Sequence, residues 1–173
     1  MAPLLTPTAA PFPAVISTAA RDATTEFFQS FCGLQSQELT LATHDPPEGE
    51  IMSTISFVGD VAWAFSMIFP ATAAVALAKA FAGFEIPADS ADLGDLVGEV
   101  VNVIAGGICA RLDRHGLRAQ MSLPTVVRGA NLSLLVPSGA ATTRMAFTSP
   151  DGVFWVQLVK APITAGPPGQ TNT

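Results

Sequence analysis

The sequence predicts a single domain in which long helices alternate with runs of β-strands. Two segments, 14–31 and 92–115, repeat apolar residues at the helical period. Each is followed by several short runs rich in Val, Ile, Phe and Thr, which are typical of strands. The chain has 173 residues, of which 49% are hydrophobic and 13% charged. That length supports one domain with a substantial core and is too short for two ordinary domains.

The first predicted helix covers residues 14–31, and Gly33 follows as a stop signal. Its candidate core positions are the apolar residues that recur along it: Val15, Ile16, Ala19, Ala23, Phe27 and Phe31. Strands are then expected at residues 38–43, 51–58 and 61–69. A turn cluster at 44–49 separates the first two, and the dipeptide Gly59-Asp60 indicates a hairpin between the second and third.

The uncharged stretch 61–78 is long enough to span a membrane, so a membrane span has to be weighed against buried elements of a folded domain. Pro70 divides it into a short aromatic half and an Ala-rich half, and proline is common at the first position of a helix. We therefore expect a buried strand followed by a buried helix over 71–82 that ends at Gly83. No membrane partner is predicted.

The second half of the chain opens with the long helix 92–115, which Ser90 or Asp92 can cap and Gly116 ends. Strands are expected at 117–123, 132–136, 142–148 and 153–160, with a turn at 149–152. The Pro-rich residues 1–13 lack the basic leader of a signal peptide. We expect them and residues 161–173 to form flexible tails around a domain at 14–160.

Charge and cysteine content exclude several classes of function. A formal charge of −6 and a pI near 4.6 argue against a nucleic-acid partner, because binding phosphates requires a basic patch. Cys32 and Cys109 lie in apolar surroundings and are expected to be buried free thiols of a reducing cytosol. His44 and His115 have no Cys or carboxylate arrangement around them, so no metal site is predicted.

The most informative motif lies in the long helix, where Asp95, Glu99 and Asn102 follow each other at intervals of four and three. That spacing places their side chains on one face of a helix. A carboxylate can hold a cation and a carboxamide can orient a water molecule, which are the groups needed to hydrolyse an acyl phosphate on another protein. A solvated helix face is the alternative explanation of the same residues.

The first helix carries a similar set, Asp22, Glu26 and Gln29, at the same spacing. The repeat indicates an internal duplication in which Gln replaces Asn. An ordinary solvated face explains it equally well, because acids and amides are common there.

Together with Pro124, the motif resembles the signature of the CheC, CheX and FliY phosphatases of bacterial chemotaxis, which dephosphorylate the response regulator CheY. The similarity extends beyond the signature. The segments that resemble CheX are Gly98-Glu-Val-Val-Asn-Val-Ile-Ala-Gly106, Leu123-Pro-Thr-Val-Val-Arg-Gly129 and the strand from Gly59-Asp60 to Phe69 with the Ala-rich helix after it. The resemblance covers roughly residues 14–160.

This resemblance implies an α+β fold with a pseudo-repeat, in which a largely antiparallel sheet packs against two long helices and one short helix. It also implies a homodimer whose sheets join across the interface. CheC and FliY typically carry two copies of the motif and CheX carries one. Because Gln29 departs from the motif and no proline follows it at the matching distance, we assign activity to the second helix only.

The resemblance also implies the roles of individual residues. Glu99 and Asn102 would be the catalytic residues. Asn102 would enter the regulator's active site and position the attacking water, and Glu99 would contact a lysine of the regulator that otherwise contacts the phosphoryl group. Asp95 would bind the partner, although an acid near a helix N-terminus also favours the helix dipole. Gly106 would let the partner approach closely, unless it serves helix packing instead. Pro124 would fix the loop beside the helix.

The expected partner is a phosphorylated CheY-like receiver domain in the cytoplasm. The chain itself has no predicted cofactor, and any Mg²⁺ would belong to the receiver. The alternative function is a noncatalytic receiver-binding or scaffold module related to the middle domain of FliM. Retention of both Glu99 and Asn102 favours the enzyme, because a scaffold does not need that pair.

Overall fold

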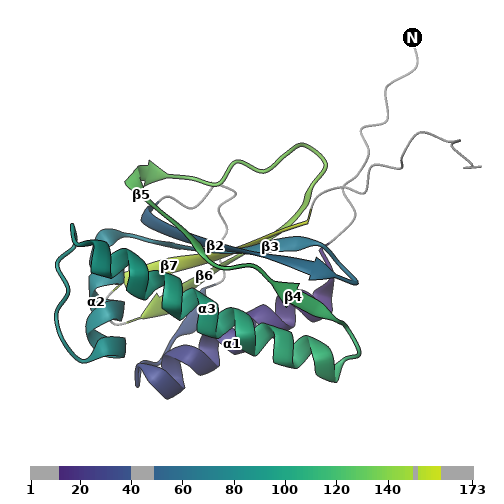
Figure 1. Cartoon of the computed structure of the whole chain (residues 1–173), viewed down its shortest axis with the longest axis horizontal. Helices are drawn as coiled ribbons and strands as arrows, with labels where there is room; N and C mark the ends of the chain where they lie inside the picture. The colour runs from purple at the N-terminus through teal and green to yellow at the C-terminus, as the bar shows by residue number, and fades with distance from the viewer. Residues whose placement is uncertain (1–11, 40–48, 150–151, 161–173) are drawn as a thin grey trace, which may run out of the picture.

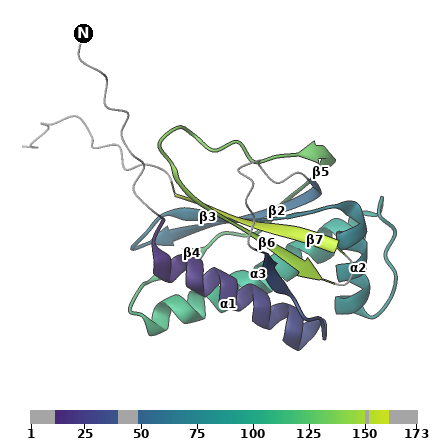
Figure 2. The same cartoon turned by 180° about the vertical axis from the view of Figure 1, so that it is seen from behind.

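The computed structural model describes residues 12–39, 49–149 and 152–160. The described elements form two layers, a seven-stranded sheet with three helices packed on one of its faces (Figure 1). Helices α1 and α3 lie side by side across that face, and α2 packs at one end, as the view from behind also shows (Figure 2). The predicted α+β fold, with two long helices and one short helix, is confirmed.

The three helices are α1 (Ala14–Phe31), α2 (Ala71–Ala82) and α3 (Ala91–Arg114). The seven strands are β1 (Gln37–Leu39), β2 (Gly49–Gly59), β3 (Trp63–Phe69), β4 (Ala119–Met121), β5 (Thr125–Leu132), β6 (Ala141–Ser149) and β7 (Gly152–Lys160). Every strand pairing among the described residues is antiparallel, and the order across the sheet is β1-β6-β7-β3-β2-β4. Strand β5 pairs with β2 beside β4. The largely antiparallel sheet was therefore predicted correctly.

The predicted hairpin at Gly59-Asp60 joins β2 to β3. Gly59 has φ +146°, and a Cβ there would lie only 2.2 Å from the carbonyl oxygen of Arg118. Glycine is the residue that tolerates both the dihedral angle and the contact. The Asp60 carboxylate accepts a hydrogen bond from the Arg118 amide at 2.8 Å. The hairpin is thereby fastened to the segment that leads into β4.

The uncharged stretch after this hairpin forms β3 and α2, with Pro70 at the N-cap of the helix. Both elements pack into the core, as predicted. Among the described helices, α3 is long and apolar enough to cross a membrane by length and composition alone. Its apolar side chains, among them Val97, Val101 and Ile104, are buried in the same core as the sheet. The mostly buried core helix of a soluble protein meets the same criterion of length and composition.

Stacked aromatic rings join α1 to the sheet. The ring of Phe28 stacks on Phe154 of β7 with centroids 4.5 Å apart, and Phe154 also stacks on Phe69 and Phe147. The prediction that Phe31 belongs to the core was wrong, because its side chain is 58% exposed. Phe31 is the last residue of α1 and stacks on Phe27 from outside. Phe28 takes the core position instead.

Two strand predictions need correction. The apolar segment 132–136 is not a strand: β5 ends at Leu132, and residues 133–140 connect it to β6. Sequence pattern favoured the later segment, but a strand needs a partner for its backbone groups, and the long β2 pairs with Thr125–Leu132 instead. The strand predicted at 117–123 is shortened to β4. Residues 40–43 of the predicted 38–43 strand lie outside the described residues.

The predicted tails fall almost entirely outside the described residues. Phe12, within the predicted N-terminal tail, is described and buried, and its ring meets Trp63 edge to face with centroids 6.1 Å apart. The packed part of the described chain therefore begins with Phe12.

Candidate functional site

Helix α3 carries the motif, and its boundaries follow from local chemistry. The Ser90 hydroxyl caps the helix by accepting a hydrogen bond from the Asp92 amide at 3.0 Å. His115 and Gly116, the latter at φ +72°, end it. Both ends were predicted, and of the two candidate caps the structure selects Ser90.

The motif residues form one outward-facing row on α3, which we call the α3 ridge: Asp95, Glu99, Asn102 and Gly106. Asp95, Glu99 and Gly106 are exposed, and Asn102 is half-buried. Within the described residues no hydrogen bond or ion pair holds the side chains of Asp95, Glu99 or Asn102. The exposed carboxylate of Glu99 and the half-buried carboxamide of Asn102 therefore lie one turn apart on the ridge, and neither is engaged by another described side chain.

Gly106 is open on its outer side. A Cβ placed there would have no neighbour within 4 Å among the described residues, so packing against another described helix does not explain the glycine. The adjacent Gly107 takes that role, since its Cβ would lie 3.5 Å from Ala23 of α1. Gly106 is therefore an accessible position on the ridge.

Strand β5 closes one flank of the ridge. A Cβ on Gly98 would lie 3.2 Å from Val126 and 3.7 Å from the Pro124 ring, so the start of β5 packs directly on the helix. The guanidinium of Arg128 donates to the Ser90 carbonyl oxygen and ties the same strand to the N-terminus of α3. Because Gly98 and Asn102 are one turn apart on the helix, Pro124 supports the surface beside Asn102. The sequence predicted support by Pro124 but not the role of Gly98.

Helix α1 closes the other flank. Arg111 of α3 forms an ion pair with Glu26 and donates to the Gly107 carbonyl oxygen at 3.0 Å. Glu26 is the position on α1 that corresponds to Glu99, and unlike Glu99 it is engaged by a cation. Asp22 and Gln29 are exposed on the same helix. The structure thus places the two similar motifs on neighbouring helices and does not bring their residues into one site.

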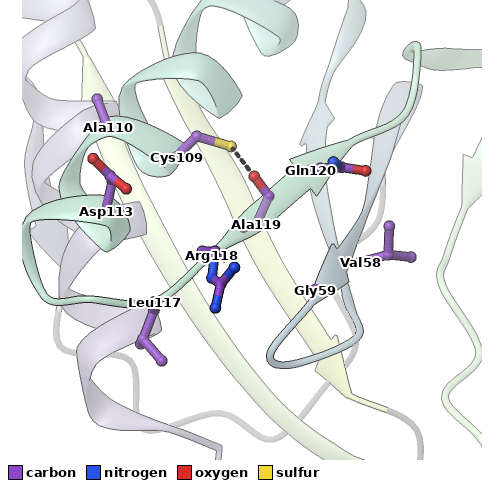
Figure 3. A pocket seen from close by; sticks show the side chains of 9 residues that line it. All are labelled: Val58, Gly59, Cys109, Ala110, Asp113, Leu117, Arg118, Ala119 and Gln120. Atoms are coloured by element: carbon purple, nitrogen blue, oxygen red, sulfur yellow. Dashed lines mark hydrogen bonds between the residues drawn. The ribbon is translucent and has the colours of Figure 1, made fainter.

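An open groove of about 620 Å³ follows the ridge toward the C-terminus of α3 (Figure 3). We call it the α3–β4 groove. Its residues come from α3, β4 and the β2–β3 hairpin: Val58, Gly59, Cys109, Ala110, Asp113, Leu117, Arg118, Ala119 and Gln120. The Cys109 thiol donates to the Ala119 carbonyl oxygen at 3.7 Å across it. Sequence reasoning missed this groove, because it depends on β4 lying against α3.

The two cysteines are free and half-buried. Burial raises the pKa of the Cys109 thiol, and it raises the pKa of Cys32 to about 11. Both thiols are therefore protonated near neutral pH, and neither has the lowered pKa of a nucleophilic cysteine. Within the described residues no three His, Cys, Asp or Glu side chains are grouped so that they could hold a metal ion.

Fold and ridge together define a class of protein: an α+β domain that presents an acid and an amide on the exposed side of a long helix. Residues 51–148 match the family model described as "Chemotaxis phosphatase CheX". The chain belongs to the CheX family of chemotaxis phosphatases. A comparison with curated proteins found no relative.

Solved structures of the same fold include chemotaxis protein CheX from Desulfovibrio desulfuricans, at 24% identity and a TM-score of 0.75 over 84% of this chain and 99% of that one. CheX from Vibrio vulnificus is 19% identical, with a TM-score of 0.78 over 84% of this chain and 99% of that one. The CheX–CheY–BeF3–Mg²⁺ complex from Borrelia burgdorferi matches at 16% identity and a TM-score of 0.65, over 83% of this chain and 96% of that one.

Proposed function

We propose that this chain is a phosphatase that hydrolyses the phosphoaspartate of a CheY-like receiver domain in the cytoplasm. The observation that carries the proposal is the α3 ridge, where Glu99 and Asn102 are adjacent and have no bonding partner among the described residues. Family membership supports a phosphatase of this kind. The complex solved for the Borrelia burgdorferi relative supports a receiver as the partner.

In this proposal Asn102 positions the attacking water. Hydrolysis of an acyl phosphate requires a water molecule in line with the leaving carboxylate, and the catalyst contributes mainly positioning and charge stabilisation. A carboxamide can accept from and donate to the same water but is too weakly basic to remove its proton. Its contribution is therefore orientation. Magnesium, when present, belongs to the receiver, as the metal in the relative's complex suggests.

The other ridge residues bind the partner. Glu99 forms a charge-assisted contact with a lysine of the receiver, which aligns the two proteins. Asp95, one turn earlier, extends this acidic surface. Gly106 offers no side chain where the receiver must come close, and Pro124 keeps β5 in place beside Asn102. We also propose a homodimer that joins through the sheet, because edge strands need cover.

The experiment is phosphate release from a CheY-type receiver charged with acetyl phosphate in Mg²⁺. We expect the wild-type chain to accelerate release and Asn102→Ala to lose at least 100-fold of that acceleration, on the order expected for lost positioning. Glu99→Gln should mainly raise KM, because it removes a docking contact. Glu85→Gln is the matched control, since Glu85 is exposed and pairs with Lys79 away from the ridge.

Equal acceleration by the wild-type chain and Asn102→Ala would remove Asn102 from the mechanism. A chain that binds the receiver tightly without accelerating phosphate loss would be the noncatalytic binding module instead.

A further inference from the structure

The α3–β4 groove continues the α3 ridge along the same helix. Gly106, Ala110 and Asp113 follow Asn102 at intervals of four, four and three, so they extend the row on one face. Asp113 lies roughly 16 Å beyond Asn102 at the helical rise of about 1.5 Å per residue. Gly106 and Ala110 are exposed and small, so the helix surface between the ridge and the groove carries no bulky side chain at these two positions.

The ridge alone is too small to hold a protein partner. A specific interface covers about 800 Å² on each side, which corresponds to a patch of roughly 16 Å radius. Four side chains on one helix do not provide that area. A receiver centred on Glu99 and Asn102 therefore has to contact neighbouring surface, and its footprint reaches the groove.

The groove has the chemistry of a docking point. Its floor is apolar, with Cys109, Leu117 and Ala119 half-buried, and Val58 at the rim is 56% exposed. Asp113 and Arg118 are exposed on its walls and form no ion pair within the described residues. In protein interfaces, a few side chains that are buried in such pockets contribute most of the binding free energy.

Two other open pockets in the described part of the chain do not extend the ridge. One lies between α1 and the end of α3, on the opposite flank, and is lined by Asp22, Arg111 and His115 among others. Another lies along α2, next to the ion pair between Lys79 and Glu85. Neither shares a helix face with Asn102.

We propose that the α3–β4 groove is a second docking point for the same receiver domain and determines how tightly the receiver binds. This inference rests on the proposed function. The occupant is an apolar segment of the receiver, flanked by charged side chains, that lies at the edge of the interface centred on the phosphorylated aspartate. The groove contributes affinity and takes no part in the chemistry.

The test measures KM and kcat separately for two variants of the groove, with the receiver that the wild-type chain dephosphorylates. Ala110→Trp fills the groove, and Asp113→Lys reverses one of its charges. We expect each to raise KM about tenfold and to leave kcat within twofold. Binding of the BeF3-activated receiver with Mg²⁺ should weaken by the same factor.

Matched controls separate the groove from general effects. Asp89→Lys makes the same charge change at an exposed site before the N-terminus of α3, and Ala14→Trp adds the same bulk at the start of α1. Both should keep the wild-type KM. Urea unfolding of each variant confirms that the fold is intact, which is expected because all four positions are exposed.

The outcomes distinguish this inference from the proposed function. If Asn102→Ala abolishes acceleration while both groove variants keep the wild-type KM and binding, the groove inference is overturned and the phosphatase proposal stands. If the wild-type chain does not accelerate phosphate release, the proposed function fails, whatever the groove variants do to receiver binding. A groove variant that lowers kcat at unchanged KM also contradicts the inference.

Discussion

At the scale of single residues, three glycines of α3 have different neighbours and therefore different roles. Gly98 packs on β5, Gly107 packs on α1, and Gly106 faces solvent. A glycine inside a helix costs about 1 kcal/mol relative to alanine, so an unpacked one needs another reason to be there. Close approach of the receiver at Gly106 is that reason in the function we propose.

Substitution at two of these glycines should have opposite effects on stability. Gly106→Ala should raise the free energy of unfolding by up to about 1 kcal/mol, because nothing occupies the space of the new methyl group. Gly98→Leu should lower it by about 1–3 kcal/mol, because even a Cβ would lie 3.2 Å from Val126. Urea denaturation of both variants checks this, and a destabilised Gly106→Ala would contradict the packing described for α3.

The sequence predicted the ridge better than its surroundings, and the reason is physical. Asp95, Glu99 and Asn102 lie on one helix, so their spacing alone places them on one face. The contacts of Gly98 with β5 and of Arg111 with α1 depend on segments distant in the chain. The spacing of Gly94 and Gly98 by one turn was the available signal for close packing there, but it does not identify the strand that packs.

At the scale of elements, helices were predicted closely because their ends carry local signals. Helices α1 and α2 match the predicted ranges, and the Ser90 cap and Gly116 define α3. Strand β5 was missed for the opposite reason. Residues 125–132 include Gly129, Ala130 and Asn131, which are depleted in strands, and only the pairing with β2 makes them a strand.

The contact between α1 and the sheet should depend on one phenylalanine and not on its neighbour. Phe28→Ala should lower the free energy of unfolding by about 3–5 kcal/mol, since the buried ring stacks on Phe154. Phe31→Ala, the same change three residues later on an exposed ring, should cost about 1 kcal/mol or less. Thermal or urea unfolding of the two variants measures these losses in the free energy of unfolding. Equal losses would mean that the two rings contribute alike to the core.

At the scale of the whole molecule, stability should depend on pH in the alkaline range. The ordinary pKa of a thiol is near 9.0, and burial raises the pKa of folded Cys32 to about 11. Between those values the unfolded chain releases the proton and the folded chain keeps it, so the stability present below pH 9 is lost as the pH rises toward 11. Cys109, whose pKa is also raised, acts in the same direction.

This pH dependence can be assigned to the thiol by substitution. Urea unfolding of the wild-type chain between pH 8 and 11 should show a steeper loss of stability than the Cys32→Ala variant shows. Parallel curves for the two proteins would mean that the thiol is as solvated in the folded state as in the unfolded one.

The position of α3 has a consequence for how such a domain diversifies. The helix is secured by α1 on one flank and by β4 and β5 on the other, and its inward residues lie in the core. Substitutions at the exposed residues of the α3 ridge remove none of these contacts. In the function that we propose, partner choice and turnover can therefore change through a few substitutions on this row while the rest of the protein stays unaltered.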